Sequence, residues 1–162
     1  MPNPEPLSSD LQYPRITPCI AYKNPGAALV WLETVCGFNN RLIVPAKDSS
    51  ISHGELEVED SLAMVAPCGV DHPNHRSPIK NHGKFTRSIS AYDKDEDTHP
   101  KWFQHNGATI VSEAQYHHGD RRYQALDCGG HLRIFCQKLK EMTKMELLST
   151  IVPGDICPSS RS

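Results

Sequence analysis

The first half of the chain reads Ala21-Tyr22-Lys23-Asn24-Pro25 and, further on, Gly37-Phe38. The second half reads Ala91-Tyr92-Asp93-Lys94 and, further on, Gly107-Ala108. From Tyr22 to Gly37 is 15 positions, and from Tyr92 to Gly107 is again 15. Two stretches that agree in residue type and in spacing indicate an internal duplication. The fold is therefore predicted to be one unit built twice.

The first copy predicts a βαβββ unit. The apolar-rich run from Ile16 to Tyr22 is typical of a strand, and Asn24-Pro25 is typical of a helix N-cap followed by proline at the first helical position. The helix is predicted over 26–36, because Gly37 stands where a left-handed residue ends a helix. Three further strands are predicted at 38–44, 52–58 and 62–66, separated by turn-rich segments.

The second copy predicts the same order, with strands at 85–92, 108–114, 121–126 and 131–137 and a helix at about 95–106. Trp31 and Trp102 occupy equivalent helix positions and are expected to anchor the core. One βαβββ unit leaves a sheet face uncovered, so the two units are expected to pair in one compact body. The predicted fold class is α+β, with two tandem βαβββ modules.

The predicted domain limits follow from these elements. Residues 1–15 are expected to form a disordered extension, and residues 16–137 a single domain. That domain consists of module one (16–67), a linker rich in proline, asparagine and histidine (68–83), and module two (84–137). A helix at 138–148 and a disordered tail are expected within 138–162.

Composition excludes several classes of protein. The chain has 162 residues, of which 38% are hydrophobic, so it can bury a core. A net charge of −2 argues against nucleic-acid binding, and no apolar run is long enough to span a membrane. The N-terminus does not look like a signal sequence, so we expect a cytoplasmic protein. The six cysteines form no C-x-x-C pair and are interpreted as reduced thiols, with a zinc site or disulfides as alternatives.

The duplication and two further motifs resemble the vicinal oxygen chelate superfamily, the group of glyoxalases, bleomycin resistance proteins and ring-cleaving dioxygenases. The motifs are His118-Gly119-Asp120-Arg121-Arg122-Tyr123 and Asp127-Cys128-Gly129-Gly130-His131-Leu132-Arg133-Ile134-Phe135. The PhnB-like subgroup is most similar, through Ile16-Thr17-Pro18-Cys19-Ile20-Ala21-Tyr22 and Ile51-Ser52-His53. The resemblance covers Ile16 to Gln137. It implies a curled, cup-shaped mixed sheet that holds a metal or a small ligand, and a homodimer.

The duplication locates the four positions where the resemblance implies metal ligands. Thr17 and Arg87 each lie five positions before the matching tyrosine, and Met64 and Ile134 each lie 27 positions after the matching glycine. Threonine is a weak ligand, methionine suits copper(I), and arginine and isoleucine cannot ligate a divalent metal. We therefore expect no metal and no cofactor.

Two residues are the candidates for chemistry. Arg87, beside Met64, Ile134 and Cys19, would place a permanent cation in an apolar hollow that suits an anionic ligand; the alternative is a solvent-facing Arg87 or a pair with Glu57. His53 lies on a central strand and suits a general base, with a structural histidine as the alternative.

The remaining site residues are expected to line the cup. The predicted ligand-binding residues are Thr17, Cys19, Met64, Tyr123, Ile134 and His118, with Tyr123 pointing into the cup. His131 is expected to make a hydrogen bond that stabilises the fold.

Three functions follow from these residues. The first is metal-independent binding of a small anionic or aromatic organic molecule in the cup. The second is a lyase, isomerase or cyclase that uses His53 and Arg87 on such a molecule. The third is a metal enzyme with displaced ligands. Because a fold does not determine a function, the sequence leaves open whether the protein is an enzyme.

Overall fold

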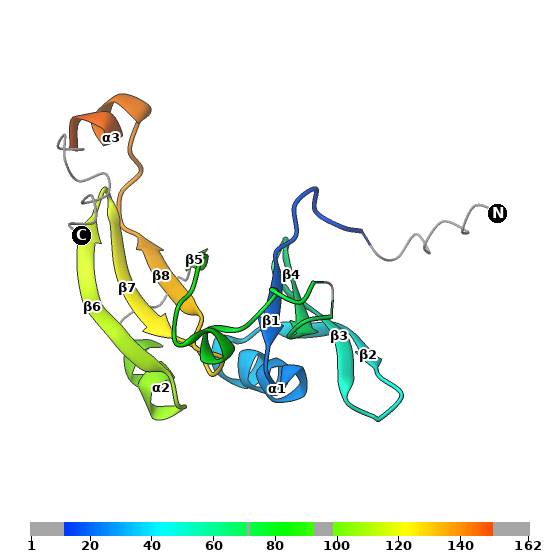
Figure 1. The fold of residues 1–162 in the computed structure, drawn as a ribbon. Helices are drawn as coiled ribbons and strands as arrows, with labels where there is room; N and C mark the ends of the chain where they lie inside the picture. Colours follow the sequence, from blue (N-terminus) through cyan, green and yellow to red (C-terminus); the bar gives the residue numbers. More distant parts are fainter. Residues whose placement is uncertain (1–11, 71, 93–98, 151–162) are drawn as a thin grey trace. The chain divides into compact units, whose positions relative to one another are not determined.

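The computed structural model describes residues 12–70, 72–92 and 99–150. It divides the chain into two compact units (Figure 1). The first unit comprises the chain up to residue 86 together with residues 128–131, and the second comprises residues 87–127 and 132 onward. The expected tail at 153–162 and most of the expected N-terminal extension lie outside the described residues.

The first unit contains one four-stranded mixed sheet and one long helix. The strands are β1 (Cys19–Tyr22), β2 (Asn39–Pro45), β3 (Ile51–Val58) and β4 (Ser61–Pro67), and they lie in the order β1-β4-β3-β2. β1 runs parallel to β4, and the other neighbours are antiparallel. Helix α1 (Pro25–Cys36) connects β1 to β2, and a short 3-10 helix, η1 (Pro78–Asn81), follows the sheet.

The second unit repeats this topology. Its strands are β5 (Ser88–Tyr92), β6 (Thr109–His117), β7 (Asp120–Leu126) and β8 (Leu132–Lys138), in the order β5-β8-β7-β6. β5 runs parallel to β8, and α2 (His99–His105) connects β5 to β6. The predicted α+β class with two tandem βαβββ modules is therefore confirmed. None of the helices within the described ranges is long and apolar enough to cross a membrane.

The capping residues place helix α1 where the sequence predicts it. The Asn24 side chain accepts a hydrogen bond from the backbone N–H of Ala27 at 3.1 Å, and Pro25 occupies the first turn. Gly37 ends the helix in the left-handed conformation, with φ of 69°.

Helix α3 (Lys144–Thr150) begins later than the helix predicted at 138–148. β8 extends to Lys138, so the sheet already uses the start of that segment. Thr143 and Glu146 form a reciprocal capping box: the Glu146 carboxylate accepts from the Thr143 N–H at 2.8 Å, and the Thr143 hydroxyl accepts from the Glu146 N–H at 3.2 Å. The Thr-x-x-Glu pattern at 143–146 was the signal for the true start.

The core of the first unit lies between α1 and one face of its sheet. Leu29 and Leu32 of α1 are buried, as are Leu56 and Val65 of the sheet. Gly54 faces Leu29 so closely that a Cβ atom at position 54 would lie 2.7 Å from Leu29 Cδ1. Because side chains alternate along a strand, the residues on either side of Gly54 must point away from α1.

The core of the second unit is aromatic. Phe103 of α2 is fully buried and meets Phe135 edge-on, with ring centroids 4.6 Å apart. Tyr123 stacks on Phe135 at 5.1 Å. Trp102 is 50% exposed, so the expectation that it anchors the core is wrong. Neighbouring helix residues point in directions about 100° apart, and Phe103 is the one that faces the sheet.

The turn at 128–131 packs against β1 within the first unit. His131 donates a hydrogen bond from Nε2 to the Ala21 carbonyl at 2.9 Å, and its ring meets Tyr22 edge-on at 4.8 Å. A Cβ atom on Gly129 would lie 2.5 Å from the Tyr22 ring, so only glycine fits there without rearrangement. The prediction that His131 stabilises the fold through a hydrogen bond is confirmed.

Replacing Gly54 by alanine is expected to destabilise the protein. The new methyl group would overlap Leu29, which is only 2% exposed, and overpacking of this kind costs about 1–3 kcal/mol. The matched control is Gly26→Ala in α1, where the nearest side-chain atom to a Cβ is an ordinary 3.4 Å away and the helix gains up to about 1 kcal/mol. Urea unfolding measures both; equal stabilities of the two variants would contradict this packing.

Candidate ligand-binding site

The face of the first sheet opposite α1 carries the candidate site, and we call it the helix-free face. Cys19 on β1 lies opposite Met64 on β4, and Met64 lies opposite Glu55 on β3. Gly54 points towards α1, so Glu55 and the two residues in register with it point the other way. Two sulfur-containing side chains and a carboxylate therefore form a row across three strands.

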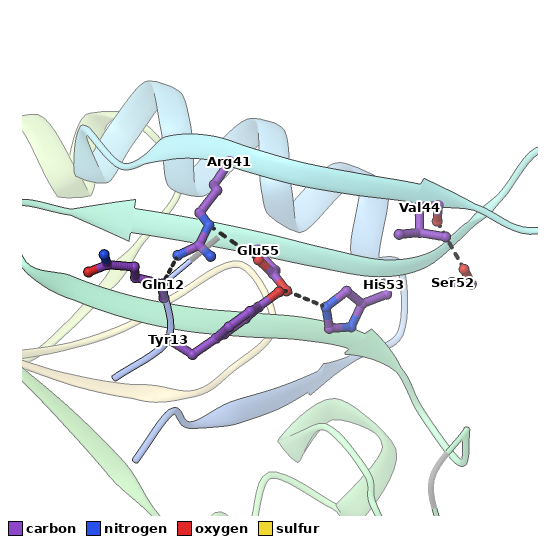
Figure 2. A network of polar contacts seen from close by, with 7 residues as sticks. All are labelled: Gln12, Tyr13, Arg41, Val44, Ser52, His53 and Glu55. Atoms are coloured by element: carbon purple, nitrogen blue, oxygen red, sulfur yellow. Dashed lines mark hydrogen bonds and ion pairs between the residues drawn. The ribbon is translucent and has the colours of Figure 1, made fainter. Parts of the chain in front are cut away.

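Glu55 is the centre of a polar network (Figure 2). Its side chain is 2% exposed. The Tyr13 hydroxyl donates to Oε1 at 2.9 Å, and His53 Nε2 donates to the same oxygen at 3.2 Å. The Nε atom of Arg41 lies 3.5 Å from Oε2. A buried carboxylate is costly unless it is paired and hydrogen-bonded; both hydrogen bonds reach Oε1, whereas Oε2 has the Arg41 ion pair and no hydrogen bond.

Arg41 joins the network from a β-bulge. The register of β2 against β3 shifts between Asn40 and Leu42, and Arg41 lies at that shift. Its guanidinium donates from Nη1 to the Gln12 carbonyl at 2.9 Å and lies 4.7 Å from the centroid of the Tyr13 ring. The cation balances the charge of Glu55 and holds the segment before β1 against the sheet.

Two groups of the network can exchange protons. The hydrogen bond to Glu55 raises the pKa of Tyr13, because the phenolate would meet a carboxylate instead of donating to it. His53 has 32% of its side chain exposed. The Glu55 carboxylate fixes the orientation of its ring, which is how proteins position a histidine for proton transfer.

Three predicted site residues lie on the helix-free face, and a fourth, Thr17, precedes it in the chain. His53 lies on β3 two positions before Glu55 and shares its face, as do Cys19 and Met64 through the strand register. Thr17 precedes β1, and its hydroxyl oxygen is shielded from solvent without a hydrogen-bond partner.

The predicted site residues of the second unit do not form one cluster. Ile134 lies on β8 opposite Ser90 and Gln124. Tyr123 is 1% exposed and stacks on Phe135, on the sheet face that α2 covers. This corrects the expectation that Tyr123 points into a cup: its strand neighbours, and not Tyr123, occupy the opposite face.

His118 lies in a turn and not on a sheet face. It precedes Gly119 in the β6–β7 turn with φ of 49°, and its Nδ1 atom is hydrogen-bonded to the Thr150 hydroxyl. Its ring also meets the His117 ring edge-on at 4.1 Å, so its described contacts are with β6 and α3.

The sequence alignment of the two modules, which makes Thr17 equivalent to Arg87, is wrong by one residue. Tyr22 is 1% exposed whereas Tyr92 is 63% exposed, so the two tyrosines used for the alignment lie in different environments. The observed registers pair Met64 with Cys19 and Ile134 with Ser90. Arg87 precedes Ser88 at the start of β5, and strand alternation separates it from the face of Ile134. Two of its guanidinium nitrogens, Nε and Nη2, are nevertheless shielded from solvent without a partner.

The second sheet has a polar cluster of its own. The Tyr92 hydroxyl donates to Asp120 Oδ2 at 3.0 Å, and this bond raises the pKa of Tyr92. Arg122, two positions along β7 from Asp120, contacts the His117 ring. Within the described parts of the chain, no three histidine, cysteine, aspartate or glutamate side chains come together to hold a metal ion.

Sequence reasoning missed Glu55, Arg41 and Tyr13. The pattern His53-Gly54-Glu55 was a usable signal, because residues two apart on a strand share a face. Arg41 depends on a bulge and Tyr13 on a contact over 42 positions, and neither leaves a local pattern.

The repeated topology defines a protein of tandem βαβββ modules. Solved structures resemble it. TioX from Micromonospora sp. ML1 has 30% sequence identity and a TM-score of 0.61, over 76% of this chain and 98% of TioX. A glyoxalase/bleomycin resistance protein/dioxygenase superfamily member from Sphaerobacter thermophilus has 17% identity and a TM-score of 0.60, over 75% of this chain and 94% of that one.

A third structure, a glyoxalase/bleomycin resistance protein/dioxygenase from Nocardioides, has 11% identity and a TM-score of 0.55, over 84% of this chain and 91% of that one. No family model and no curated protein matches the sequence. The chain is therefore a relative of TioX, and it has the fold of the glyoxalase/bleomycin resistance protein/dioxygenase superfamily, the group that its motifs resemble.

Replacing Glu55 by glutamine is expected to lower the pKa of Tyr13 towards the ordinary value for tyrosine. The hydrogen bond to a negative carboxylate is the main cause of the raised value, and glutamine removes the charge. Ultraviolet absorbance follows the ionisation of all the tyrosines with pH. Subtracting the titration curve of Tyr13→Phe leaves the contribution of Tyr13. The matched control Glu57→Gln, on the same strand, should leave the titration unchanged; a similar effect of both variants would contradict the network.

Proposed function

We propose that the protein binds a small aromatic or anionic organic molecule on the helix-free face of the first sheet, without a metal ion. The observation that carries this proposal is the buried Glu55 carboxylate with His53 beside it on that face. Burying a carboxylate is costly, and the core that α1 stabilises lies on the other side of the sheet. A polar network in this position therefore favours a role in recognition.

The neighbours of Glu55 suit the apolar part of such a ligand. Met64 and Cys19 are half-buried and lie in register with Glu55. Thioether sulfur makes favourable contacts with aromatic rings and adapts to different shapes. His53 supplies a polar group at the edge of this surface for a substituent on the ring.

Arg87 is a separate candidate for holding an anionic group. A guanidinium with two shielded, unpartnered nitrogens leaves hydrogen-bonding capacity unused, and a carboxylate or phosphate group would satisfy it. Arg87 belongs to the second unit, so such an anion is not the ligand proposed for the helix-free face of the first sheet.

A ligand of this kind is expected to raise the melting temperature of the protein. A thermal-shift panel of aromatic acids and phenols, with EDTA present throughout, would identify it, because a ligand at 100 times its dissociation constant stabilises the native state by about 2.7 kcal/mol. Met64→Ala should weaken binding about tenfold through lost apolar contact. Met145→Ala is the matched control, since Met145 is 76% exposed on α3.

Three outcomes of this experiment would count against the proposal. The first is a panel in which no compound stabilises the protein. The second is an equal loss of affinity in the Met64 and Met145 variants. The third is a shift that appears only when EDTA is left out, which would contradict metal independence.

A second candidate function is acid–base catalysis as a lyase, isomerase or cyclase. The orientation of His53 by Glu55 at 3.2 Å favours it, because a general base needs a fixed ring and an accessible nitrogen. Two of the similar structures are of superfamily members, and the name of that superfamily covers both enzymes and a resistance protein.

The catalytic alternative predicts that His53→Ala abolishes turnover of a compound from the panel. Loss of a general base typically lowers the rate by about 10²–10⁴-fold, whereas loss of a ligand contact changes KM more than kcat. Product formation followed by mass spectrometry tests this. An unchanged kcat in His53→Ala would leave binding as the function of this site.

A further inference from the structure

Tyr13 makes the contacts that an aromatic ligand of the Glu55 site would make. Its hydroxyl donates to Glu55 Oε1 at 2.9 Å, and the Arg41 guanidinium carbon lies 4.7 Å from the centroid of its ring (Figure 2). A hydrogen bond to a charged acceptor and a cation beside an aromatic ring are the two standard ways in which proteins hold a phenol. The site therefore already contains one.

We propose that the ligand of this site is a hydroxyaromatic molecule bound as a neutral phenol, and that Tyr13 is an internal substitute that it displaces. The inference rests on the proposed function and names the class of ligand and the group that competes with it. In the bound state the ligand hydroxyl donates to Glu55, its ring lies beside Arg41, and its far edge reaches Met64 and Cys19.

The charges of the site select the protonation state of the ligand. Glu55 accepts from Tyr13 and disfavours the phenolate next to it, which is why the pKa of Tyr13 is raised. Arg41 is the cation facing Glu55, and His53 is the other titratable group in direct contact with the carboxylate. A neutral hydroxyl that donates a proton to a hydrogen bond fits this set of partners better than an anion does.

The segment that carries Tyr13 is suited to displacement. Residues 12–18 precede β1 and belong to no helix or strand. Tyr13 is 39% exposed and Ile16 is 88% exposed, so apolar burial holds this segment only weakly. The contacts of Glu55 and Arg41 with Tyr13 and Gln12 are the interactions that a ligand has to replace. A ligand that binds only when Tyr13 has left loses apparent affinity in proportion to the time that Tyr13 occupies the site.

Calorimetric titration with 2-naphthol and its methyl ether, 2-methoxynaphthalene, tests the inference on the full chain. Tyr13→Ala should bind 2-naphthol about tenfold more tightly than the unchanged protein, because the competitor is gone. Tyr13→Phe should lie between the two, since the ring stays and the hydrogen bond is lost. Tyr116→Ala is the matched control, as Tyr116 is 80% exposed on β6.

Comparing 2-naphthol with its methyl ether measures the contribution of the hydrogen bond between the ligand hydroxyl and Glu55. In the Tyr13→Ala protein, 2-naphthol should bind several-fold more tightly than 2-methoxynaphthalene, which has no proton to donate. Adding Glu55→Gln should reduce this preference, because the charged acceptor is removed.

The outcomes separate this inference from the proposed function. Equal affinity of Tyr13→Ala and the unchanged protein for 2-naphthol, or a preference over the ether that survives Glu55→Gln undiminished, would overturn the inference alone. Binding of aromatic acids that depends on Met64, with no binding of 2-naphthol to any variant, would also overturn the inference and leave the proposed function intact. Failure of every aromatic compound to bind any variant would overturn both.

Discussion

Each module of this protein has a four-stranded sheet with two faces and one helix to cover them, and this constraint governs the rest of the structure. The covered face becomes the core: Leu29 fits over Gly54 in the first unit, and Phe103 meets Phe135 in the second. Because side chains alternate along a strand, every second side chain then lies on the face of the sheet that the helix does not cover. Those positions are free to carry chemistry.

In the first unit, the helix-free face carries a buried charged residue, Glu55. Glu55 is as buried as the core residues on the other side of the strand, yet it is a carboxylate. Its burial depends on partners from three places in the sequence: the segment before β1, the bulge in β2 and a position two residues earlier on β3. A group held in this way is fixed in position, which favours specific recognition of a ligand over general adhesion.

The two modules have kept their topology and diverged in chemistry. Register by register, Cys19, Met64 and Glu55 of the first sheet correspond to Ser90, Ile134 and Gln124 of the second. Gln124 is a neutral counterpart of the Glu55 carboxylate. Ser90 and Ile134 lack the sulfur atoms of Cys19 and Met64. The second sheet instead buries Asp120 near its edge, bonded to Tyr92. The duplication is therefore symmetric in its backbone, while the candidate ligand site belongs to one half.

The sequence by itself determined the tandem βαβββ order, the limits of α1, the place of His53 on a central strand and the structural role of His131. Local signals carry these features: caps at Asn24 and Gly37, apolar periodicity, and glycines beside a histidine. Only the tertiary structure decided that Tyr13 covers Glu55, that Tyr123 lies under α2, and that Phe103 and not Trp102 is the anchor. These depend on which way a strand or helix faces, and a shift of one residue reverses that direction while leaving the composition of the segment unchanged.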